Sequence, residues 1–135
     1  MRIRFIAAAA FVFAVLASIS CGGITDPSKN TTETFTGTVA PGGSGTVHTF
    51  NISNTGEFSV KVTAMTPTFN SFFATTLGIV QSGNCAPFQQ NTLSTVGAQS
   101  MNGPIFQKGT YCVYVWDANL TMTTTETYTL TVSHP

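Results

Sequence analysis

The feature that most constrains this chain is a series of short runs in which apolar and polar side chains alternate. The clearest run, residues 57–64, reads EFSVKVTA, with its apolar side chains at Phe58, Val60, Val62 and Ala64. A period of two is typical of a β-strand with one buried and one exposed face. No stretch after residue 33 offers the apolar stripe of an amphipathic helix. We therefore expect an all-β domain.

Similar runs follow one another along the chain, separated by turn residues such as those at 41–45 (PGGSG) and 54–56 (NTG). The other expected strands cover residues 33–39, 46–52, 75–81, 93–99, 105–106, 110–116 and 126–133, and residues 82–91 are expected to form a loop. About eight short strands with regular turns are typical of an antiparallel β-sandwich.

The end of the chain carries a more specific pattern. Residues 109–117 read GTYCVYVWD, and residues 128–132 read YTLTV. They resemble the end of the bacterial pre-peptidase C-terminal domain family, with its Gly-x-Tyr-x-Val-x-Val, turn, Tyr-x-Leu-x-Val pattern. Residues 35–39, 48–52 and 56–60 are similar to its beginning, so the resemblance covers about residues 33–134. It implies a jelly-roll-like β-sandwich that acts as an accessory or binding module.

The family pattern also implies which side chains of the seventh run face inward. With the alternate residues of Tyr111–Val115 in the core, Tyr114 and Trp116 share the opposite face with Cys112. Rigid aromatic side chains on a surface are suited to binding a ligand or partner. The alternative is that the loop at residues 82–91 covers them. The expected core is Phe35, Phe50, Phe58, Val60, Val62, Leu77, Ile79, Tyr111, Val113, Val115, Tyr128, Leu130 and Val132.

The first twenty residues predict a signal peptide. Arg2 and Arg4 precede the uncharged apolar segment Phe5–Ala17, and Ser18 and Ser20 supply the small residues of a cleavage site. The apolar segment is shorter than the roughly 20 residues that a membrane-spanning helix needs. The alternative, a buried core helix, would precede a polar stretch with nothing to bury it.

Cys21 makes the expected cellular localisation more specific. Residues 16–21 read LASISC and resemble a lipobox, although Ser18 stands where leucine is usual. The resemblance implies a diacylated Cys21 as the mature N-terminus and a membrane partner, with residues 22–32 as a flexible tether to a domain at 33–135. Ordinary cleavage after Ser20, giving a released protein, is the alternative. Either way, we expect export to a bacterial cell envelope.

The remaining cysteines, Cys85 and Cys112, predict a disulfide. Three cysteines are an odd number, and acylation of Cys21 would leave this pair in an oxidising compartment. A metal site is the competing interpretation, but neither cysteine has a closely spaced Cys or His neighbour. We expect no cofactor.

The charge balance argues against a nucleic-acid partner. After Cys21 the chain has three lysines and five acids, a net charge of about −2, whereas nucleic-acid binding requires clustered Lys and Arg. Its 24 threonines suit the exposed faces of strands.

No constellation predicts catalysis. His48 is expected to be a half-buried structural residue, His134 to fray at the end of the chain, and Asp117 to form a turn. Two functions stay open: a non-catalytic module that binds a polysaccharide or protein, and a structural component of an envelope complex. Exposed strand edges would favour the second, since an unprotected edge can pair with another chain.

Overall fold

Eight antiparallel strands make up most of the computed structural model, which describes residues 27–135. The predicted signal peptide and Cys21 lie outside the described residues. After the 3-10 turn η2 (Pro27–Lys29), the strands are β1 (Thr31–Val39), β2 (His48–Ile52), β3 (Gly56–Thr66), β4 (Phe73–Gln81), β5 (Asn84–Ser94), β6 (Gln99–Ile105), β7 (Gly109–Trp116) and β8 (Glu126–His134). None of the helices in this part of the chain has the length and hydropathy of a membrane span.

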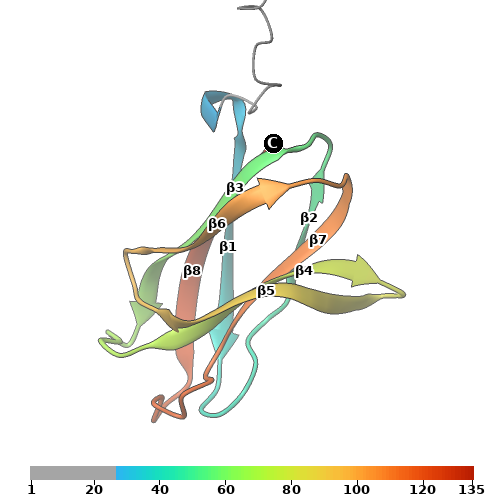
Figure 1. Ribbon diagram of the computed structural model, residues 1–135. Coiled ribbons are helices and arrows are strands. Elements are labelled where there is room, and N and C mark those ends of the chain that lie inside the picture. Colours follow the sequence, from blue (N-terminus) through green and yellow to red (C-terminus); the bar gives the residue numbers. More distant parts are fainter. Residues whose placement is uncertain (1–26) are drawn as a thin grey trace, which may run out of the picture.

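The strands form two four-stranded sheets, in the orders β1-β8-β3-β6 and β2-β7-β4-β5 (Figure 1). Successive strands alternate between the sheets except at the β4–β5 hairpin, and every pairing is antiparallel. This order is the jelly-roll arrangement of a β-sandwich. The predicted fold class is therefore confirmed.

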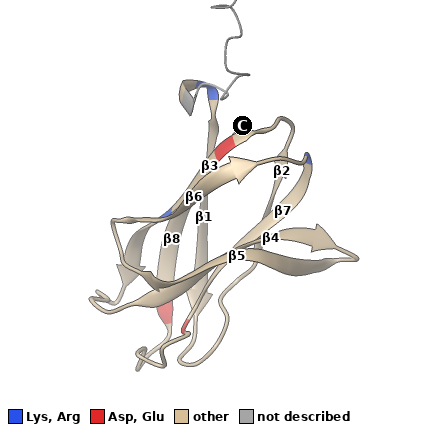
Figure 2. Cartoon of the chain, viewed as in Figure 1, with Lys and Arg blue, Asp and Glu red and all other residues tan. Residues whose placement is uncertain are grey.

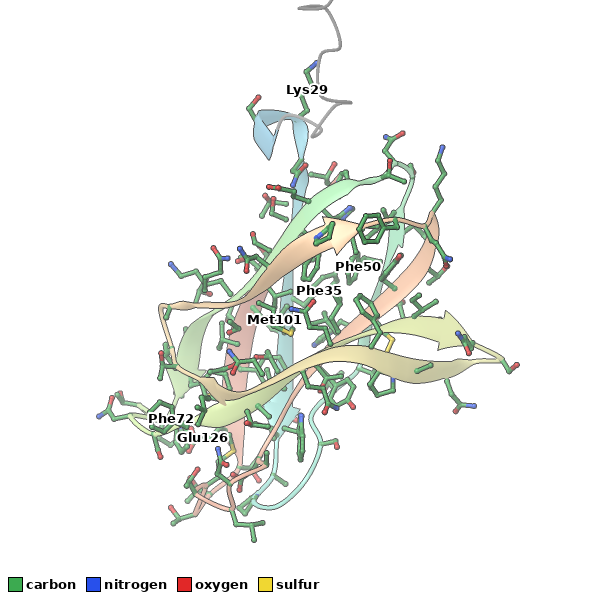
Figure 3. The ribbon with its side chains drawn as sticks, viewed as in Figure 1. Lys29, Phe35, Phe50, Phe72, Met101 and Glu126 are labelled. Atoms are coloured by element: carbon green, nitrogen blue, oxygen red, sulfur yellow. A yellow bond between two sulfur atoms is a disulfide. The ribbon has the colours of Figure 1, made fainter. Side chains whose placement is uncertain are left out.

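The two sheets enclose one apolar core. Every predicted core residue is buried except Phe35 and Ile79, which are partly buried and pack against the core. Phe35 and Phe50 meet between the sheets, with ring centroids 6.3 Å apart (Figure 3). Period-two alternation therefore identified the inward face of most strands, because each strand contributes alternate side chains to one layer.

β3 departs from the predicted alternation near its end. Val62 pairs with Leu130 and Ala64 with Thr129, so the residue between them is an extra one, a β-bulge. A bulge reverses the phase of the side chains that follow it. Ala64 is consequently exposed and Met65 is buried. The prediction that Ala64 faces inward was wrong.

The segment after β4 differs most from the secondary structure predicted from the sequence. Residues 82–91, predicted to be a loop, begin with a two-residue turn at Ser82 and Gly83, both with positive φ, and continue as β5. Positive φ at both central positions suits a tight hairpin. The strand predicted at 93–99 does not exist as such, because β5 ends at Ser94 and β6 starts at Gln99. Pro87 and a register shift beside Gly78 conceal the alternation of β5.

The sandwich has two distinct ends. Asn30 donates a hydrogen bond to the Glu57 carbonyl (2.8 Å), and Gly56 pairs with Ile105. The start of β1, the β2–β3 turn and the β6–β7 turn therefore lie at one end, which we name the tether end (Figure 1). The loops at residues 40–47, 67–72 and 117–125 form the opposite, distal end.

Candidate ligand-binding face

Tyr114 and Trp116 lie on the outer face of the sheet β2-β7-β4-β5. The residues that alternate with them on β7, from Tyr111 to Val115, are buried in the core, as the family pattern implied. Both aromatic side chains are half-buried rather than covered. We name the surface formed by Tyr114, Trp116 and the β4 residues beside them, Ala74 and Thr76, the aromatic face.

Small residues of β4 lie beside the two rings on the same side of the sheet. Ala74 pairs with Trp116 and Thr76 with Tyr114, so that paired side chains point to the same side of the sheet. Ala74 and Thr76 are fully buried although they lie on the outer face. The indole N–H of Trp116 donates a hydrogen bond to the Thr76 hydroxyl (3.0 Å). The Trp116 ring is thus held by a hydrogen bond, and part of each ring stays accessible.

A disulfide fixes the next part of this face. Cys85 of β5 and Cys112 of β7 are bonded, which confirms the predicted pair. The bond passes over Gly78 of β4, where an added Cβ would lie 2.5 Å from the Ala86 carbonyl oxygen and 2.9 Å from the Cys85 sulfur. Residues 82–91, which cover the aromatic rings in the alternative interpretation, instead form a turn and the start of the edge strand β5 beside β4, linked to β7 by the disulfide.

The sheet that carries the aromatic face has no charge. Its strands β2, β4, β5 and β7 contain no Asp, Glu, Lys or Arg, whereas β1, β3 and β8 of the other sheet contain Glu33, Glu57, Lys61 and Glu126 (Figure 2). Exposed polar side chains flank the rings, with Thr49 opposite Cys112 and Gln90 opposite Thr76. The face therefore offers aromatic carbon and uncharged hydrogen-bonding groups.

His48 has the half-buried structural position that was expected. Its ring stacks on Phe35, and its Nε2 lies 3.1 Å from the hydroxyl of Tyr128. That hydroxyl donates a hydrogen bond to the Thr46 carbonyl (2.7 Å), so the Nε2–H of a neutral His48 is the donor to it. Burial lowers the pKa of His48, which favours this neutral form.

The same contact explains Gly37. A Cβ at this position would lie 2.6 Å from the Tyr128 hydroxyl oxygen, so only glycine leaves room for it. Burial is the main influence on Tyr128 and raises its pKa to about 12. Tyr128 and His48 therefore join the two sheets through a neutral polar contact.

The prediction that His134 frays was wrong. It is the last residue of β8, pairs with Thr31 and is only 4% exposed. Its Nε2 lies 2.9 Å from a Glu33 carboxylate oxygen, and its ring lies against Phe50, with centroids 5.1 Å apart. The reason is that β1 begins two residues earlier than expected and pairs with the end of β8.

Asp117 forms a turn, as predicted. It accepts backbone hydrogen bonds from Gly42, Thr121 and Met122 at 2.9–3.2 Å and is almost fully buried. Burial alone would raise the pKa of its carboxyl group, but these hydrogen bonds outweigh burial and the pKa is lowered. Asp117 thus joins the loop after β1 to the loop after β7. Within residues 27–135, no three His, Cys, Asp or Glu side chains converge on a possible metal position.

A second accessible apolar surface was missed by the sequence interpretation. Between the edge strands β5 and β6, near the tether end, lies a cavity of about 180 Å³ lined by Ile79, Phe88, Pro104, Ile105, Phe106, Gln107 and Tyr111. Phe106 is 80% exposed and Phe88 is 49% exposed. Phe106 directly follows the buried Ile105. The available signal was this pair of consecutive apolar residues just before a turn, where alternation would place a polar residue.

Comparison with models of known protein families finds no match, and comparison with curated proteins finds none either. The resemblance to the pre-peptidase C-terminal domain family therefore stays a prediction from the motifs.

Proposed function

We propose that this protein is an exported, membrane-anchored, non-catalytic module that binds an uncharged polysaccharide through the aromatic face. The observation that carries the proposal is the pair of half-buried rings, Tyr114 and Trp116, on a sheet without a charged side chain. Aromatic rings that are rigid and partly exposed are efficient contact surfaces, because little side-chain freedom is lost when a ligand binds.

The chemistry of the face favours a sugar over a charged ligand. Sugars present C–H groups that pack on aromatic rings and hydroxyls that hydrogen-bond to uncharged polar side chains, here Thr49 and Gln90. A charged ligand would lose water without gaining an opposite charge on this sheet. Tyr114 and Trp116 are two residues apart on one strand, about 7 Å, so neighbouring sugars of a chain can contact both.

The proposed localisation rests on the N-terminal sequence and is supported by the disulfide. The charged start, apolar segment and small residues before Cys21 have the order of an export signal. The Cys85–Cys112 bond suits an oxidising compartment outside the cytoplasm. Mass spectrometry of the mature N-terminus tests the anchor, with a diacylated Cys21 as the expected species. A mature chain that begins elsewhere or carries an unmodified Cys21 would refute it.

Tyr114→Ala is the direct test of the binding face. We expect the wild-type protein to retain at least one uncharged polysaccharide from an immobilised panel. Losing one stacked ring should weaken binding by about 1 kcal/mol, roughly fivefold. Trp116→Ala is less suitable, because it also removes the hydrogen bond from the indole N–H to the Thr76 hydroxyl and should lower stability.

Phe72→Ala is the matched control, since Phe72 is a half-exposed aromatic residue at the distal end. It should leave binding unchanged. Equal binding by the Tyr114 variant and the wild type, or no binding to any polysaccharide, would overturn the assignment. Capture of an envelope protein that depends on Tyr114 would replace the polysaccharide by a protein ligand.

One observation favours the alternative, an assembly component. β1 is a nine-residue edge strand without proline, paired only with β8. The other long edges are less suited to pairing with another chain, because β5 contains Pro87 and a bulge and β6 contains Pro104. Only part of the β1 edge is free to pair, because the Thr46 N–H already bonds to the Thr38 carbonyl near the end of the strand (3.2 Å). Concentration-dependent association in sedimentation experiments would support this alternative.

A further inference from the structure

The tether end of the sandwich combines an exposed aromatic side chain with two lysines. Phe106, 80% exposed, and Lys108 belong to the turn between β6 and β7. Lys29 belongs to η2 (Figure 3). Neither lysine forms a salt bridge with a carboxylate of the described residues. The cavity beside Phe106 continues the apolar surface to Phe88 and Pro104.

We propose that this end lies on the lipid surface, with the Phe106 ring inserted at the interface and Lys29 and Lys108 facing anionic headgroups. The inference rests on the proposed membrane anchor at Cys21. Amphipathic surfaces of this kind bind membranes through apolar side chains at the headgroup boundary, and nearby lysines are attracted to anionic lipids.

The length of the chain outside the structure decides which end meets the membrane. Six residue steps separate Cys21 from Pro27, and a fully extended chain of that length reaches only about 20 Å. The nine residues of β8, from Glu126 to His134, run along the sandwich for about 30 Å. If the distal end lay on the membrane, the tether would have to reach back along the sandwich for about 30 Å. A tether of about 20 Å is too short for this.

Charge and exposure agree with this orientation. The distal end also exposes apolar side chains, Phe72, Leu93 and Leu120, but its ionisable groups are acidic, with Asp117 and Glu126 buried there. Among the described Asp and Glu residues at the tether end, Glu33 is paired with His134, and Glu57 is the other one. With the tether end on the lipid, the aromatic face stands at the side of the domain, open to a ligand in the surrounding space.

The test places a tryptophan at each end and measures quenching by brominated acyl chains. The processed chain is coupled through the Cys21 thiol to a maleimide lipid in vesicles of phosphatidylethanolamine and anionic phosphatidylglycerol. Cys85 and Cys112 are in the disulfide, so Cys21 is the thiol that reacts. Phe106→Trp is the probe and Phe72→Trp is the matched control, both measured against the wild type with its native Trp116.

We expect brominated lipids to quench Phe106→Trp more strongly than the wild type, and Phe72→Trp no more than the wild type. Replacing phosphatidylglycerol by an uncharged lipid should reduce the additional quenching. Quenching of Phe106→Trp that does not exceed that of Phe72→Trp would overturn the inference. Because coupling imposes the anchor, this result is independent of natural acylation, which the N-terminal mass decides separately.

Discussion

At the scale of single residues, Gly78 shows how closely β5 approaches β4. A methyl group there would meet the backbone oxygen of Ala86 at 2.5 Å, and backbone cannot move aside as a flexible side chain can. We predict that Gly78→Ala lowers the free energy of unfolding by about 1–3 kcal/mol, the range of overpacked sites. Urea unfolding of the oxidised protein measures it.

Gly103→Ala is the matched control for that substitution. Gly103 is also a strand glycine, but its nearest neighbour would be a Phe58 ring carbon at 3.3 Å, which needs only a small adjustment. We expect a much smaller change in stability. Equal losses for the two variants would show that the close approach at Gly78 is not what sets the cost.

At the scale of elements, the Cys85–Cys112 bond joins β5 to β7 across β4. Closing a loop of this length stabilises a fold by about 3.5 kcal/mol in the chain-entropy model. We predict that Cys85→Ser, Cys112→Ser and the double variant all lose a similar amount, because each removes the same bond once. Calorimetry or urea unfolding gives the three values. A small loss in Cys85→Ser beside a large loss in Cys112→Ser and the double variant would assign the loss to packing at the fully buried Cys112 instead.

The elements also show what alternation can and cannot predict. Strands whose side chains follow an unbroken period of two, such as β7 and β8, were placed on the correct face from their sequence. The bulge in β3 is invisible to that rule, because it arises from pairing with β8 and moves Met65 inward. In β5, Pro87 and a register shift hide a strand whose place is set by the hairpin turn and the disulfide. The aromatic face was predictable, but the surface at Phe106 depends on which strand edges meet in space.

At the scale of the whole molecule, the hydroxyl of Tyr128 is a buried polar contact between the two sheets, through Thr46 and His48. Burial raises the pKa of Tyr128 in the folded state to about 12, against 10.0 for an ordinary tyrosine. A raised pKa gives stability that is complete below pH 10 and is lost as the pH rises toward 12, because only the unfolded state readily ionises. Two pH units correspond to about 2.7 kcal/mol, so we predict a loss of roughly 2–3 kcal/mol. Urea unfolding across this range measures it, and tyrosinate absorbance reports the ionisation. Burial raises the pKa of Tyr111 as well. Tyr128→Phe should therefore reduce the loss of stability at alkaline pH without abolishing it. An unchanged alkaline loss in Tyr128→Phe would remove Tyr128 as its main source.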